Sequence, residues 1–145
     1  MTDGFVKVKD GYKYQLQEAT VFSTGILNRD ISTDFIVLNR QGRLLLSKGY
    51  ATDGITGISK YPWRKILERD WLLYASFGHD ALYQLMREGL LPKELKPLID
   101  DLLVKWSLEA GAWKWQTDIV HGLVSMFGAN HADNKRDIIV VPAIA

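Results

Sequence analysis

Residues 70–86 read DWLLYASFGHDALYQLM, and their apolar side chains recur every few positions. That period is typical of an amphipathic α-helix. On a wheel of about 100° per residue, one stripe holds a histidine and a tyrosine among apolar and small residues: Leu72, Ala75, Ser76, His79, Leu82, Tyr83 and Met86. The sequence therefore predicts a helix that turns His79 toward the core.

Helical spacing continues on both sides of this stretch. We predict helices over Trp63–Arg87, Pro97–Trp113 and Trp115–Phe127. Gly89 and several prolines interrupt the pattern between the first two helices. Pro97 suits a first helical turn, where its missing N–H has no intrahelical partner to lose. Two helices joined by so short a connection should pack antiparallel.

The residues before this helical region follow a different period. Short apolar runs, at Phe5–Val8, Tyr12–Tyr14, Phe35–Leu38 and Leu44–Leu46, are separated by turn residues such as Arg40-Gln41-Gly42. Short strands joined by turns produce that pattern. The sequence predicts an α+β fold, with N-terminal antiparallel strands, a bundle of about three helices and a short C-terminal strand.

Length and composition fit one domain over residues 1–145, with a strand-rich segment (1–58), a helical segment (61–128) and a β-rich tail (137–145). The chain contains no cysteine, which excludes a disulfide scaffold, a zinc ribbon and a thiol nucleophile. The formal net charge of +1 gives no reason to expect nucleic-acid binding. Neither a signal peptide nor a membrane-spanning apolar stretch is visible, so we do not expect an integral membrane protein.

The candidate chemistry centres on His79. A buried imidazole needs a partner that fixes its tautomer, and a general base usually has a carboxylate on a facing helix. Asp100 lies at the edge of the apolar face of the second helix, whereas Asp101 points away. Tyr83 lies one turn after His79, where its hydroxyl can reach the same partner. His79, Asp100 and Tyr83 are therefore the predicted catalytic residues.

Several motifs between Leu44 and Asn130 together resemble a phage and prophage family known only as a domain of unknown function. The resemblance is carried by GYATDG at 49–54, HDALY at 79–83, Asp100 followed by Gly111, and VSMFG at 124–128. The chain departs from the family where Ile55-Thr56-Gly57 stands in place of the more usual Ala-Ser-Ile-Pro. The resemblance implies a phage protein that is made in the host cytoplasm, with association with the virion left open.

The pattern His79-Asp80-x-x-Tyr83, with an Asp on a following helix, also resembles secreted and parvoviral sn-2 phospholipases. That resemblance implies that His79 activates water, that Asp100 orients His79, and that Tyr83 binds the same carboxylate. It also implies a Ca²⁺ ion held by Asp80 and by carbonyls of a glycine-containing loop. The nearby turn at Asp53-Gly54 supplies the remaining candidate metal ligands, although it does not reproduce the loop pattern of those enzymes.

Each of these residues also has a structural interpretation. His79 could be a core histidine satisfied by Asp100 or Tyr83 without any substrate. Asp80 could form a salt bridge to Arg87 or Lys96, and Asp53-Gly54 could be a turn in which the Asp side chain caps the backbone.

Two functions therefore stay open. One is a hydrolase, calcium-dependent or metal-free, that acts on lipid or cell-envelope esters during phage entry or lysis. The other is a non-enzymatic virion, tail or accessory protein that binds phage structural proteins. Solvent access to His79 separates them, because a general base must reach its substrate.

Overall fold

The computed structural model describes residues 5–7, 14–52 and 70–133. These residues form antiparallel strands in two sheets, followed by three helices, so the predicted α+β class is confirmed. The strands and the helices belong to two compact units, each described separately below. The predicted C-terminal strand in the tail 137–145 and residues 53–69, including the start of the first predicted helix, lie outside the described residues. The one-domain assignment stays a prediction.

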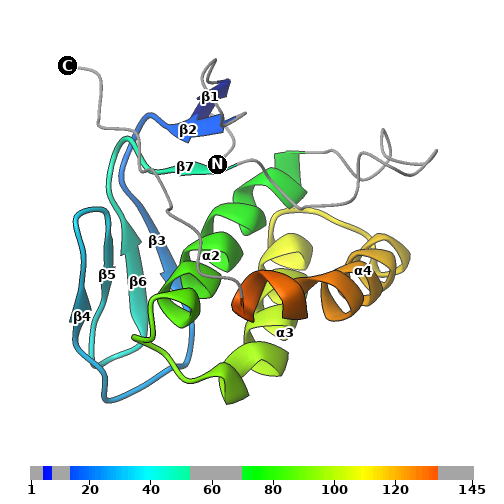
Figure 1. Ribbon diagram of the computed structural model, residues 1–145. Helices are drawn as coiled ribbons and strands as arrows, with labels where there is room; N and C mark the ends of the chain where they lie inside the picture. The colour runs from blue at the N-terminus through cyan, green and yellow to red at the C-terminus, as the bar shows by residue number, and fades with distance from the viewer. Residues whose placement is uncertain (1–4, 8–13, 53–69, 134–145) are drawn as a thin grey trace. The chain divides into compact units, whose positions relative to one another are not determined.

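The larger sheet has the strand order β3-β6-β5-β4 (Figure 1). Its strands are β3 (Thr20–Ser23), β6 (Arg43–Leu46), β5 (Ile36–Leu38) and β4 (Ile31–Ser32). The register pairs Phe22 with Leu44, and Leu44 with Leu38. Because side chains alternate along a strand, these three residues share one face, and all three are buried.

The turn between β5 and β6 forms where Arg40-Gln41-Gly42 predicts it. The Asn39 side-chain oxygen accepts hydrogen bonds from the backbone N–H groups of Gln41 and Arg43. Gly42 has φ +82°, a left-handed conformation that favours glycine. The smaller sheet has the order β1-β2-β7 and consists of β1 (Phe5–Lys7), β2 (Tyr14–Leu16) and β7 (Ala51–Thr52).

The helical unit contains α2 (Asp70–Arg87), α3 (Lys96–Glu109) and α4 (Lys114–Asp133), with a short 3-10 helix, η2 (Lys93–Leu95), before α3. The helices pack against one another, and α2 and α3 run in opposite directions, as predicted (Figure 1). The whole predicted stripe of α2 is buried: Leu72, Ala75, Ser76, His79, Leu82, Tyr83 and Met86.

Glycine ends two of these helices. Gly89 follows α2 with φ +77°, and the next N–H, that of Leu90, bonds back to the carbonyl of Leu85. Gly111 follows α3 with φ +113°. The prediction that the second helix continues to Trp113 is wrong, because the chain leaves the helical conformation at Gly111, and the Trp113 side chain is exposed.

Candidate functional site

His79 and Tyr83 lie one turn apart on α2 and form one side of the candidate site. Their rings contact each other with centroids 4.3 Å apart and planes tilted by 36°. The small residue Ser76 lies one turn earlier and satisfies its own hydroxyl by donating to the Leu72 carbonyl at 2.6 Å. Both rings are therefore fixed by the helix and available to a group on a neighbouring helix.

That group is Asp100 of α3, as the sequence predicts. Its Oδ1 lies 2.9 Å from His79 Nε2 and accepts a hydrogen bond from the Tyr83 hydroxyl at 2.6 Å. The exposed fractions of the His79 and Asp100 side chains are 6% and 2%. The structure thus brings together the three predicted catalytic side chains in a buried position, while their catalytic roles stay predictions.

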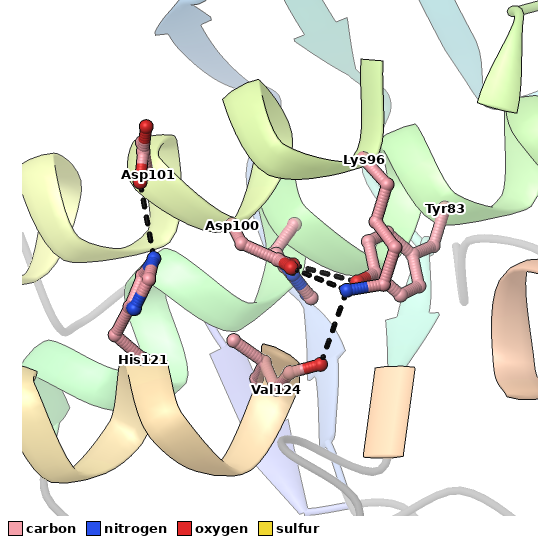
Figure 2. Close-up of polar contacts among 7 residues, drawn as sticks. Tyr83, Lys96, Asp100, Asp101, His121 and Val124 are labelled. Carbon is pink, nitrogen blue, oxygen red and sulfur yellow. Dashed lines mark hydrogen bonds and ion pairs between the residues drawn. The ribbon is translucent and has the colours of Figure 1, made fainter. Parts of the chain in front are cut away.

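The sequence interpretation missed a fourth member, Lys96. Its Nζ lies 2.7 Å from Asp100 Oδ2 and 3.5 Å from the backbone carbonyl of Val124 on α4 (Figure 2). The i,i+4 spacing of Lys96 and Asp100 was the available signal, but a helix predicted to start at Pro97 left Lys96 outside it. We call His79, Tyr83, Lys96 and Asp100 the Asp100 cluster.

The cluster keeps Asp100 ionised. Burial on its own raises the pKa of Asp100, but hydrogen bonds from His79, Lys96 and Tyr83 outweigh it, so the pKa falls below the usual value. Burial raises the pKa of Tyr83, and the hydrogen bond to Asp100 and its negative charge raise it further, against a smaller opposing effect of Arg87. Tyr83 therefore stays protonated and donates its hydrogen bond.

This charge state fixes the tautomer of His79. An ionised carboxylate can only accept hydrogen bonds, so the proton between the two side chains belongs to His79 Nε2. In the neutral imidazole the lone pair is then on Nδ1. Nδ1 is consequently the ring nitrogen of His79 that can take up a proton.

Asp80, the predicted calcium ligand on α2, lies beside a cation. Its Oδ1 is 4.0 Å from Arg87 Nη2, which matches the salt bridge considered as the structural alternative. Among the residues that the structure describes, no group of three or more His, Cys, Asp or Glu side chains could hold a metal ion. Asp53 and Gly54 lie outside those residues. The described residues alone therefore do not make a calcium site.

A second His–Asp pair joins α3 to α4. His121 Nε2 lies 3.1 Å from Asp101 Oδ1 (Figure 2), and both side chains are largely in contact with solvent. The sequence interpretation pointed Asp101 away from the apolar face of its helix, which agrees with this exposure, but assigned no partner to Asp101. Only the packing of α4 beside α3 makes this pair visible.

The tryptophans that the structure describes divide into two groups by their exposure. Trp71 and Trp106 are buried, whereas Trp113, just before α4, and Trp115, in the first turn of α4, are exposed. Exposed apolar side chains that form a large patch mark protein or lipid interfaces.

Comparison with known proteins adds no relative: the chain matches no family model, no curated protein and no solved structure. None of the helices in the described part of the chain combines the length and apolar character needed to cross a bilayer.

Proposed function

We propose that this chain is a phage-encoded hydrolase that uses His79 as a general base against lipid or cell-envelope esters. The observation that carries the proposal is the 2.9 Å contact between His79 Nε2 and an Asp100 carboxylate that also accepts the Tyr83 hydroxyl. A histidine acts as a general base when an ionised carboxylate orients its imidazole ring, and here a hydroxyl also supports the carboxylate.

The chemistry follows from the tautomer. His79 Nδ1 takes a proton from water as the water oxygen forms a bond to the ester carbonyl carbon. The imidazolium is then stabilised by Asp100 through Nε2, because the charges are close in a buried site. When the carbon–oxygen bond of the ester breaks, Nδ1 returns the proton to the departing alcohol. Acid and alcohol are the products, and His79 ends in its starting state.

A second candidate function is supported by the burial of the site. A general base must meet its substrate, yet the His79 side chain is only 6% exposed. The same contacts would serve a non-enzymatic virion, tail or accessory protein in which the Asp100 cluster holds α2 and α3 together.

Ester hydrolysis separates the two functions. The wild-type chain is assayed on phospholipid vesicles and on soluble short-chain esters, beside His79→Ala and a matched control, His121→Ala. The hydrolase predicts turnover that is lost in His79→Ala and kept in His121→Ala, because the control histidine also pairs with an aspartate. No turnover by the wild type on any ester would favour the non-enzymatic function.

The calcium prediction has its own test. Calorimetric titration of Ca²⁺ into the wild type and into Asp80→Asn measures binding directly, and the hydrolysis assay is repeated with a chelator. Saturable binding that Asp80→Asn abolishes, with hydrolysis that stops in chelator, would establish a calcium-dependent enzyme. Hydrolysis that continues in chelator would indicate the metal-free form of the same reaction.

A further inference from the structure

Lys96 occupies a position that the reaction above does not explain. It is the first residue of α3, and its side chain is 19% exposed, far less than the 82% of Lys114, a lysine of α4 that also has an i,i+4 aspartate partner. A lysine ammonium placed at the margin of a buried site has lost much of its contact with water. The contacts it makes inside the protein must therefore replace that hydration.

Those contacts complete the carboxylate of Asp100. One oxygen, Oδ1, accepts hydrogen bonds from His79 and Tyr83. The other, Oδ2, accepts a hydrogen bond from the Lys96 ammonium at 2.7 Å. Figure 2 shows Lys96 and Tyr83 converging on the Asp100 carboxylate. With both oxygens in use, the carboxylate group cannot rotate without breaking at least one charge-assisted hydrogen bond. Its negative charge is also balanced inside the bundle.

We propose that Lys96 is a positioning residue, whose ammonium holds Asp100 as a fixed, ionised acceptor and so keeps His79 in the tautomer with its proton on Nε2. A role of Lys96 in catalysis rests on the proposed hydrolase function, whereas the effect of Lys96 on the His79 tautomer does not. Lys96 touches no reacting atom in this scheme and acts only through Asp100.

The contact of Lys96 with α4 extends the same argument. The 3.5 Å approach of Nζ to the Val124 carbonyl joins α4 to the cluster, although it is longer than the bond to Asp100. Lys96 therefore links the third helix of the unit to an acid–base pair formed by the other two. A replacement must keep both the charge and the reach to preserve the arrangement, and arginine keeps the charge on a long side chain, with a planar guanidinium in place of the compact ammonium.

The test is the ¹⁵N and ¹H NMR signature of the His79 ring in the full chain. The wild type should show a protonated Nε2, with its proton shifted downfield by the carboxylate, and an unprotonated Nδ1. Lys96→Met should lose that proton signal and show a mixture of tautomers, while Lys96→Arg should restore it. Lys114→Met, which removes the solvent-exposed ion pair with Asp118, is the matched control and should leave the His79 signals unchanged.

The His121 ring provides an internal reference, because its signals should not respond to Lys96. Wild-type His79 signals in Lys96→Met would overturn the proposal. If circular dichroism shows that Lys96→Met does not fold, Lys96→Gln replaces it, since glutamine keeps a hydrogen-bond donor without the charge. Loss of the Nε2 proton signal in Lys96→Gln would support the proposal, and its retention would overturn it.

Activity adds a second readout that separates this inference from the proposed function. If the wild type hydrolyses esters, Lys96→Met should lower kcat by up to about 100-fold, as a misplaced catalytic group does, with little change in KM. An equal kcat in Lys96→Met and wild type would contradict the positioning role. A wild type without turnover, whose His79 signals still depend on Lys96, would reject the hydrolase and retain the positioning role.

Discussion

Consecutive residues of α3, Asp100 and Asp101, each pair with a histidine. The two pairs differ mainly in how far their side chains are exposed to solvent. His79 and Asp100 are 2.9 Å apart, with side chains 6% and 2% exposed. His121 and Asp101 are 3.1 Å apart, with side chains 42% and 70% exposed. The chemical groups are the same and the distances nearly so, which leaves burial as the variable.

Burial changes what such a pair needs from the rest of the protein. The exposed pair shares its hydrogen-bonding groups with water, which also screens its charges. The buried carboxylate has lost that water, so it requires replacement donors, and Tyr83 and Lys96 supply them. A buried His–Asp pair is therefore recognised by the additional donors around its carboxylate, rather than by the distance between the histidine nitrogen and the carboxylate oxygen.

Removing the buried carboxylate should have the largest effect on stability. Asp100→Ala leaves His79, Tyr83 and Lys96 without their shared acceptor, and breaking a buried pair in this way costs about 3–5 kcal/mol. Urea denaturation, followed by circular dichroism, measures the free energy of unfolding. A loss below about 1 kcal/mol, the usual value for a surface pair, would mean that the two His–Asp pairs do not differ energetically.

Removing only the tyrosine hydroxyl should have an intermediate effect. Tyr83→Phe keeps the ring against His79 but deletes a hydrogen bond of 2.6 Å to an ionised carboxylate. Hydrogen bonds to charged groups contribute about 1.5–3 kcal/mol. A double-mutant cycle with Asp100→Asn isolates the coupling between the two side chains. If the two substitutions changed the free energy of unfolding additively, the Tyr83 hydroxyl would not support Asp100.

Acid should lower the free energy of unfolding, in part because Asp100 becomes protonated. Because the pKa of folded Asp100 lies below its ordinary value of 3.8, the unfolded chain binds more protons as the pH falls below 3.8. The stability that Asp100 contributes is therefore complete above this pH and is lost as the pH falls through the folded pKa. The titration of one group changes the slope of the free energy of unfolding against pH by at most about 1.4 kcal/mol per pH unit.

The acid effect is measured as the free energy of unfolding against pH from 2 to 6 in steps of about half a unit. Asp100→Asn should show a shallower acid decline than the wild type, since the titrating group is gone. Parallel curves for wild type and Asp100→Asn would contradict the lowered pKa.

Removing the exposed carboxylate should have the smallest effect. Asp101→Ala breaks the pair with His121, which is an ion pair only while His121 is protonated, and exposed ion pairs contribute about 0.2–1 kcal/mol. The loss should shrink further in about 1 M salt, where screening acts over roughly 3 Å. Thermal unfolding with and without salt measures both quantities. A cost that is independent of salt and equal to that of Asp100→Ala would remove the distinction between the pairs.

The sequence predicts much of this arrangement because local periodicity specifies it. The wheel of residues 70–86 places His79 and Tyr83 on one buried face, and the edge position of Asp100 indicates its direction. The strand pattern and the Arg40-Gln41-Gly42 turn are equally local. These features depend on spacing that a single segment contains.

The features that the sequence missed depend on helix ends and on distant contacts. A helix beginning one residue earlier than predicted brings Lys96 within reach of Asp100, and helix boundaries are the least reliable part of such predictions. Gly111 ends α3 before Trp113, which places that ring in solvent. The contact between His121 and Asp101 joins residues twenty positions apart, so no local pattern indicates it.

The adjacency of Asp100 and Asp101 also ties the axial register of α3 to both neighbouring helices. One residue ties α3 to α2 and the next ties α3 to α4, so both cross-links lie at the same level along α3. If α3 slid by one turn, about 5.4 Å, both pairs would break together, and no partial shift would preserve either. For engineering, the length of α3 between Lys96 and Asp101 should therefore be left unchanged, because these two residues and Asp100 make contacts that depend on this spacing.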